Sequence, residues 1–142
     1  MREILFKAKR LSDGAWVEGF PYWGEYSGAF ILQNKTYSRR NARTGEISMG
    51  DNVVPIEVDP STVCQYTGLT DKNGKKIFEG DIISWPDWRN DQRKAPVRYD
   101  DEWKRFCVWL NGAESMGVNK HLSTGGIEVI GNVHDGEGDD DD

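Results

Sequence analysis

Apolar residues recur at every second position along much of the chain, and this pattern predicts β-strands rather than helices. Ile4, Phe6 and Ala8 form the first such run, and residues 15–20 form the second, with Asp13-Gly14 between them. An Asp-Gly pair between two short alternating runs is typical of a tight hairpin turn, because glycine adopts a positive φ without a Cβ clash. The N-terminal residues are therefore predicted to form a β-hairpin that turns at Asp13 and Gly14.

The next part of the chain alternates between short apolar runs and a polar stretch. Residues 29–32 and 53–58 read as strands, and Pro55 lacks a backbone donor, which places the second of them at a sheet edge or a bulge. Residues 33–51 are polar and are predicted to form a long loop or a mobile hairpin. Residues 59–62 favour one helical turn, with Pro60 in its first position.

A second turn signal, Asn73-Gly74, separates residues 65–69 from residues 77–83. Within the latter run, Gly80 and Asp81 are predicted to form a further structural turn, with the Asp81 carboxylate accepting hydrogen bonds from turn amides. Later strands are expected at residues 95–99, 104–110 and 127–133. Residues 85–94 read as a loop, in which residues 86–88 could open a short helix.

The fold class follows from these periods. No stretch longer than about ten residues keeps a helical period, and sixteen glycines are spread over the whole chain. The prediction is a mainly β protein, either a small β-barrel or a strongly bent antiparallel sheet with little helix, with an SH3-like C-terminal part as one option. Residues 1–134 are expected to form a single domain, in which 1–58 and a barrel over 59–134 could be sub-regions.

The charge of the chain is concentrated at its C-terminal end. The 142 residues carry a formal net charge of -6, with 18 basic and 24 acidic residues. Six of the carboxylates lie in residues 135–142, so the preceding residues are balanced at 18 acidic and 18 basic. A run of like charges without apolar residues repels itself, so residues 135–142 are predicted to be a disordered acidic tail.

The charged N-terminus and the absence of about 18 consecutive apolar residues predict a cytoplasmic protein without a signal peptide or a membrane span. In that compartment Cys64 and Cys107, which fall in predicted strands, are expected to be buried and reduced.

Catalytic and cofactor motifs give weak signals. The soft metal ligands Cys64, Cys107, His121 and His134 lack the spacing of a zinc site, and His121 near Ser123 is too little for a nucleophilic site. The acidic groups at 79–81 and 100–102 read as turn chemistry, and no phosphate-binding glycine motif occurs. We therefore expect no enzyme, no metal and no cofactor.

Aromatic residues interleaved with basic ones give the best candidate binding surface. Aromatic rings stack on bases and guanidinium groups hold phosphates, so such a surface on a β-protein can bind single strands. Carboxylates interrupt the cluster that contains Trp88 and Trp103, and the balanced charge of residues 1–134 weakens the electrostatic argument for nucleic-acid binding. The candidate residues are Arg39, Arg40 and Arg43 in one cluster, near Tyr37, and Trp88, Arg89, Arg93, Lys94 and Trp103 in the other.

Residues 58–83, with Gln65-Tyr66-Thr67-Gly68-Leu69 and Glu79-Gly80-Asp81-Ile82 as their most specific blocks, resemble the central signature of the YopX family. Residues 2–9 and 14–19 are similar to its N-terminal hairpin, and residues 127–134 to its C-terminal strand. The resemblance implies a small, mainly β protein of a bacteriophage or prophage that acts in the bacterial cytoplasm. It carries over no catalytic residues, because the family has no established activity.

These features together favour a non-catalytic binding module that contacts a host or phage macromolecule, a protein rather than a nucleic acid. The first alternative is a single-stranded nucleic-acid binder that uses the candidate residues above. The second alternative is a homo-oligomeric structural protein, whose interface would include the edge strand with Pro55 and exposed aromatic residues.

Overall fold

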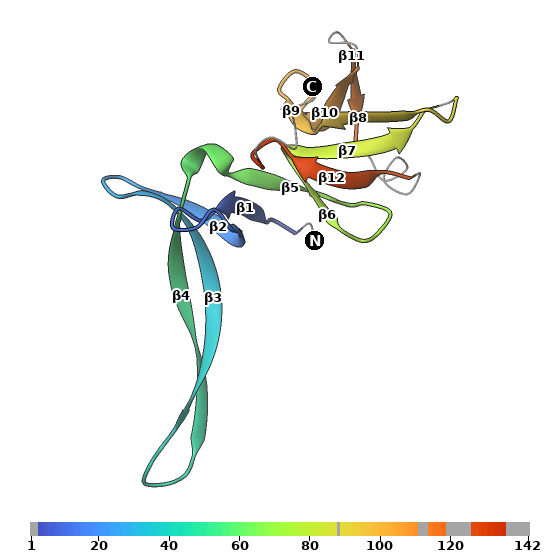
Figure 1. Cartoon of the computed structure of the whole chain (residues 1–142). Coiled ribbons are helices and arrows are strands. Elements are labelled where there is room, and N and C mark those ends of the chain that lie inside the picture. The colour runs from blue at the N-terminus through green and yellow to red at the C-terminus, as the bar shows by residue number, and fades with distance from the viewer. Residues whose placement is uncertain (1–2, 88, 111–113, 119–125, 136–142) are drawn as a thin grey trace. The chain divides into compact units, whose positions relative to one another are not determined.

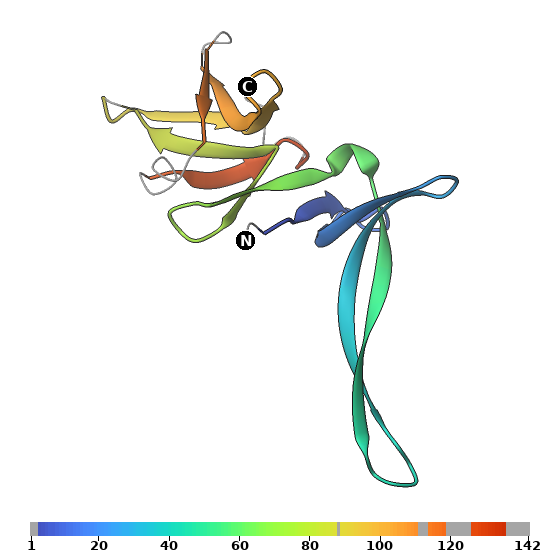
Figure 2. The ribbon, with the colours of Figure 1, turned by 180° about the vertical axis from the view of Figure 1, so that it is seen from behind.

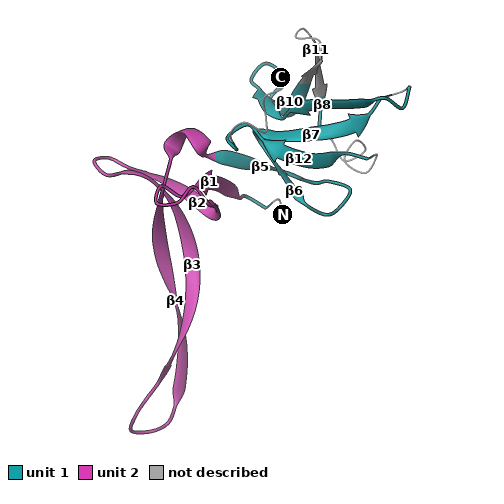
Figure 3. Cartoon of the chain, in the orientation of Figure 1, with its two compact units in different colours: residues 1–4, 64–142 teal, residues 5–63 magenta. Residues whose placement is uncertain are grey.

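A computed structural model describes residues 3–87, 89–110, 114–118 and 126–135 of the chain. The expected tail over 135–142 lies outside these residues, apart from Asp135. The chain divides into two compact units, coloured separately in Figure 3. One unit comprises residues 5–63, and the other comprises residues 1–4 and 64–142. The described residues contain no helix that is long and apolar enough to cross a membrane.

The unit of residues 5–63 is an antiparallel sheet in the order β4-β3-β2-β1 (Figure 1). Its strands are β1 (Phe6–Lys9), β2 (Trp16–Gly24), β3 (Gly28–Arg40) and β4 (Ile47–Val58). Lys9 pairs with Trp16, and Gly14 has a φ of 76° between them, which confirms the predicted hairpin. Its small core consists of Ala8, Ala29, Ile31 and Val58, with Phe6, Val17 and Val63 packed against it.

The predicted helical turn is present as the 3-10 helix η1 (Pro60–Thr62). The Asp59 carboxylate caps it by accepting a hydrogen bond from the Ser61 amide at 3.0 Å, and Pro60 occupies its start. Thr62 is buried, and its hydroxyl accepts a hydrogen bond from the Lys9 amide at 2.8 Å. The turn is thereby tied to strand β1.

Residues 33–51 form a hairpin, so the hairpin alternative was right and the loop alternative wrong. Strands β3 and β4 pair without a bulge from Ala29 opposite Val58 to Arg40 opposite Ile47. Figures 1 and 2 show the two strands running side by side to a shared tip. Strand β4 is the end strand of this sheet, which confirms the edge position predicted from Pro55.

The other unit begins with the hairpin of β5 (Cys64–Thr70) and β6 (Lys76–Phe78). Two three-stranded antiparallel sheets follow, in the orders β12-β7-β8 and β11-β10-β9. Their strands are β7 (Asp81–Pro86), β8 (Gln92–Pro96), β9 (Arg98–Asp100), β10 (Arg105–Leu110), β11 (Glu114–Gly117) and β12 (Glu128–Asn132). The apolar core of this unit contains Ile77, Ile83, Trp85, Val97, Val108 and Ile127.

The structure confirms a mainly β, antiparallel protein and corrects two finer expectations. Among the described residues no closed barrel is found, because the strands are divided over separate open sheets; this corrects the barrel alternative. The SH3-like option for the C-terminal part stays a prediction. The expected loop over 85–94 is instead the β7–β8 hairpin, in which Trp85 pairs with Arg93. Its polar strand β8 hides the alternation, since residues 92–94 are all exposed. Cys64 and Cys107 are buried and form no disulfide.

Candidate functional site

The outer part of the β3–β4 hairpin, residues 34–53, is exposed along nearly its whole length. We call it the distal ribbon. Strand β2 pairs with β3 only between Gly28 and Leu32, so the distal ribbon consists of β3, β4 and their connecting loop. All its residues are exposed except Gly50, which is half-buried. The distal ribbon therefore buries no core of its own, although its strand pairing is regular.

The regular register divides the side chains of the distal ribbon between two faces. Directly paired residues share a face, and successive residues alternate between faces. We call the first the basic face; it carries the opposed pairs Lys35 with Asn52, Tyr37 with Gly50, and Arg39 with Ser48. The second, the mixed face, carries Asn34, Thr36, Ser38 and Arg40 opposite Val53, Asp51, Met49 and Ile47. The basic face contains no carboxylate, whereas the mixed face contains Asp51 and an apolar row.

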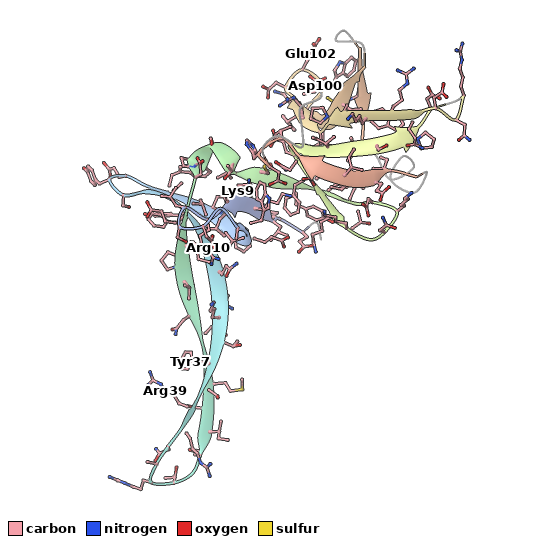
Figure 4. All side chains as sticks on the ribbon, viewed as in Figure 1. Lys9, Arg10, Tyr37, Arg39, Asp100 and Glu102 are labelled. Atoms are coloured by element: carbon pink, nitrogen blue, oxygen red, sulfur yellow. The ribbon has the colours of Figure 1, made fainter. Side chains whose placement is uncertain are left out.

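Tyr37 holds the centre of the basic face in place. A Cβ atom added to Gly50 would lie 2.6 Å from the Tyr37 hydroxyl oxygen, so the tyrosine ring lies across the glycine backbone. The Cζ atom of Arg39 is 5.4 Å from the centre of the same ring, within range of a cation–π interaction. Figure 4 shows Tyr37 and Arg39 projecting from the same side of the ribbon. The ring thus favours a position of the Arg39 guanidinium beside it.

The tip of the distal ribbon is an ordered loop. The Asn41 side-chain oxygen accepts hydrogen bonds from the amides of Arg43 at 2.8 Å and Thr44 at 3.1 Å. The Asn41 amide donates to the Glu46 carbonyl at 2.8 Å, and Gly45 has a φ of 75°, a conformation that favours glycine. This turn holds Arg43 at the tip, so the structure brings Arg39, Arg40 and Arg43 together at one end of the ribbon, as their spacing in the sequence suggested.

The second predicted cluster is divided between two sheets. Arg93 and Lys94 lie exposed on β8, and Arg89 is exposed in the turn that precedes it. The Nε atom of Arg93 donates to the Asp87 carboxylate at 3.0 Å, and this hydrogen bond lowers the pKa of Asp87. Trp88 lies outside the described residues. These cations share their surface with a carboxylate, which reduces their attraction for phosphate.

The aromatic residues within and beside the second cluster differ in exposure. Trp85 is buried in the core, and Tyr99 and Phe106 form an edge-to-face pair with ring centres 5.3 Å apart. Trp103 is different, because it is 67% exposed and the Arg105 guanidinium lies 5.7 Å from its ring centre. It belongs to the turn between β9 and β10. The described aromatic residues of this part of the chain are therefore divided between the core and the surface.

A polar cavity of about 550 Å³ adjoins this turn and was missed in the sequence. Its lining includes Gln65, Glu79, Tyr99, Lys104 and Arg105. Burial raises the pKa of Glu79, while the positive charge of Arg98 opposes the shift. A half-buried carboxylate beside cations can bind a polar small molecule or act as an acid or base. No sequence motif marks it, because its residues come from four separate segments.

The other conspicuous carboxylates bind backbone amides. Asp81 is buried, and it accepts hydrogen bonds from the Phe78 amide at 2.8 Å and the Asn132 side chain at 2.9 Å, as the turn prediction required. Asp13 receives two hydrogen bonds from the Arg10 guanidinium, which lower the pKa of Asp13 to about 2. Asp100 accepts from the Glu102 amide at 2.9 Å (Figure 4).

The predicted Asn73-Gly74 turn is also built around a carboxylate. Asp71 is buried, which by itself would raise its pKa, but hydrogen bonds from the amides of Val129, Lys75 and Asn73 outweigh this and lower the pKa of Asp71. Among the described residues, no three His, Cys, Asp or Glu side chains gather as a metal site would require. His121, one of the soft ligands considered above, lies outside those residues.

Sequence reasoning also missed the exposed aromatic residues of β2 and its turn. Phe20, Tyr22, Trp23 and Tyr26 are between 53% and 92% exposed. Near the base of the distal ribbon, Phe20, Leu32 and Val53 line an open groove of about 620 Å³. The high density of aromatic residues between positions 20 and 26 was the feature of the sequence that could have indicated this exposed aromatic surface.

The fold and these surfaces define an all-β protein that presents a long β-ribbon. The chain belongs to the YopX family, since the family model described as YopX protein matches residues 6–137. This confirms the resemblance that the sequence showed. The fold is similar to that of protein EF1440 from Enterococcus faecalis, a crystal structure with 24% identity and a TM-score of 0.56 over 94% of this chain and 95% of that chain. No curated protein matches the chain in sequence.

Proposed function

We propose that this chain is a non-catalytic binding module of a bacteriophage or prophage, which contacts a macromolecule in the bacterial cytoplasm through the distal ribbon. The observation that carries the proposal is the exposure of residues 34–53 on both faces. A two-stranded hairpin is marginal in water unless another surface covers it. A regular ribbon with a hydrogen-bonded tip and no core therefore supports a role in contact with a partner.

The use of the carboxylates supports the non-catalytic part of the proposal. Asp71, Asp81 and Asp100 are buried and engage backbone amides at turns. Hydrogen bonds from backbone amides lower the pKa of Asp71, so its carboxylate is a poor proton acceptor. Glu79 in its polar cavity is the exception, and it is the residue to remove if an enzymatic activity is ever detected.

One observation favours a second candidate function, a homo-oligomer. Strand β4 is the end strand of its sheet, and its outer part exposes Ile47, Met49 and Val53. Such a strand can pair with a second copy unless proline, charge or twist prevents it.

The pair of Trp103 and Arg105 supports the alternative of a single-stranded nucleic-acid binder, because one base can stack on the exposed tryptophan ring.

The ribbon can be removed without touching the core of its unit. Gln33 and Val54 are directly paired, so an Asn-Gly turn between them replaces residues 34–53 and closes the shortened hairpin. The trimmed and wild-type proteins are used to capture partners from a bacterial lysate, with and without nuclease, and their thermal unfolding is compared.

We expect the trimmed protein to fold and to lose the macromolecule that the wild type retains. Equal capture by both proteins would contradict the proposal. So would a hydrolase or nuclease activity that Glu79→Gln or Asp81→Ala abolishes while the fold is retained.

A further inference from the structure

The structure assigns a partner to the basic face of the distal ribbon: we infer that it docks in the major groove of double-stranded DNA. The inference rests on the proposed function and names the class of macromolecule. Its first support is charge. The paired residues of the basic face include Lys35 and Arg39 and no carboxylate, while the tip loop adds Arg43 and the carboxylate of Glu46. A polyanion therefore meets cations on this face without a repelling group.

The second support is shape. The major groove of B-form DNA is about 12 Å wide and admits a two-stranded β-ribbon. The strands of such a ribbon lie about 4.8 Å apart, and residues 34–40 extend about 23 Å at the usual rise of about 3.3 Å per residue. The distal ribbon has no third strand along these residues to block its entry.

The third support is the chemistry of the opposed pairs. Arg39 is paired with Ser48 and Lys35 with Asn52, so hydrogen-bonding groups stand on both strands of the basic face. Arginine and lysine bind guanine edges or phosphates, and asparagine pairs with the edge of adenine. Tyr37 lies between the two pairs and holds Arg39 at 5.4 Å from its ring centre. The Arg39 guanidinium is thereby positioned beside the ring before DNA binds.

Other partners fit the basic face less well. A second copy placed face to face would bring like charges together, which opposes association. A protein interface is usually anchored by buried apolar or aromatic side chains, and Tyr37, the one aromatic residue on this face, already contacts Gly50 and Arg39. Duplex RNA has a major groove too deep and narrow for side chains to read. The mixed face has Asp51 near its middle, so phosphates are expected to approach from the basic face.

The test measures binding of the full chain to a labelled DNA duplex of about 20 base pairs by fluorescence anisotropy, beginning at low salt. Duplex RNA and single-stranded DNA of the same sequence are measured in parallel. We expect duplex DNA to bind most tightly, with an affinity that falls as salt rises. Arg39→Ala and Lys35→Ala should each weaken binding about tenfold and reduce the salt slope by about one.

Two charge-matched variants make the test specific to the face. Arg40→Ala removes the neighbouring cation from the mixed face and should weaken binding by no more than about threefold. Lys75→Ala removes an exposed cation from the Asn73-Gly74 turn and should leave affinity unchanged. All four side chains are exposed or lie on the ribbon surface, so circular dichroism should show the same fold in every variant.

Several results would overturn the inference. These are the absence of DNA binding at low salt, equal losses for Arg39→Ala and Arg40→Ala, or tighter binding of duplex RNA or single-stranded DNA. A ribbon-dependent protein partner without DNA binding would also overturn it while leaving the proposed function intact. A dimer that depends on concentration and disappears on trimming would overturn it in favour of a second copy. If the full chain binds no DNA, and if trimming the ribbon changes nothing that is captured from the lysate, both the inference and the proposed function are contradicted.

Discussion

The distal ribbon and the β12-β7-β8 sheet are both antiparallel, yet they use their side chains in opposite ways. In the sheet, Ile83 and Trp85 are buried, and the carboxylate of Asp81 binds groups within the fold. In the ribbon, Lys35, Arg39 and Arg40 are exposed. The same backbone pairing therefore surrounds a core in one region and leaves the side chains of the other exposed. Substitutions should lower stability in the first region and affinity in the second.

The largest expected effect follows the loss of the Asp81 side chain. Asp81→Ala leaves the buried amide of Phe78 and the amide group of Asn132 without their acceptor. Two buried donors without an acceptor should lower the free energy of unfolding by about 3 to 5 kcal/mol. Urea denaturation followed by tryptophan fluorescence measures the change. Asp51→Ala on the ribbon is the matched control, expected to stay within about 0.5 kcal/mol; similar losses for both variants would break the comparison.

Asp71 should show the next largest effect and a defined dependence on pH. Its pKa is lower in the folded chain than its ordinary value of 3.8, so its ionised form stabilises the fold above that value. This stability is lost as pH falls through the folded pKa. Asp71→Asn should therefore cost about 1 to 3 kcal/mol at pH 7, and the difference from wild type should shrink below about pH 4. A difference independent of pH would exclude the ionised carboxylate as its source.

Glu79 should behave in the opposite sense with a smaller magnitude. Burial raises its pKa above the ordinary 4.5, so folding binds its proton more tightly and stability falls as pH rises through that range. Glu79→Gln should increase the free energy of unfolding at pH 7 by less than about 1 kcal/mol, since the group is only half-buried. Unfolding at pH 4 and pH 7 compares the two proteins. A loss of stability at pH 7 would show that the carboxylate has a structural role.

The smallest effect on stability is expected at Gly50. A Cβ atom there would lie 2.6 Å from the Tyr37 hydroxyl, and the tyrosine side chain can move aside. Gly50→Ala should therefore alter the free energy of unfolding by no more than about 0.5 kcal/mol. The ring should lose its fixed place, and NMR signals of Tyr37 and Arg39 should shift. Unchanged signals would show that Tyr37 does not lie across the glycine.

The pattern of the sequence predicted the elements that local chemistry controls. The Asp13-Gly14 hairpin, the helical turn at Pro60, the edge position of Pro55 and the turn at Asp81 all follow from residues close in the chain. The β7–β8 hairpin was missed, and for residues 33–51 a loop stayed open beside the hairpin. The outer part of β3 and residues 92–94 of β8 carry no apolar alternation, because they are exposed and no core selects apolar residues there.

The β class and the main turns could be predicted from the chain's local pattern, because periodicity and turn residues act over short distances. The family and the three arginines within five residues are also evident in the linear sequence. Which aromatic residues are buried depends instead on how distant segments pack together. Trp85 enters the core while Trp103 stays exposed. Arg39 and Arg40 lie on opposite faces because successive residues of any strand alternate. The register of β3 with β4 decides which residues of β4 join each of them, and it places Asp51 on the face of Arg40 and Ser48 on the face of Arg39.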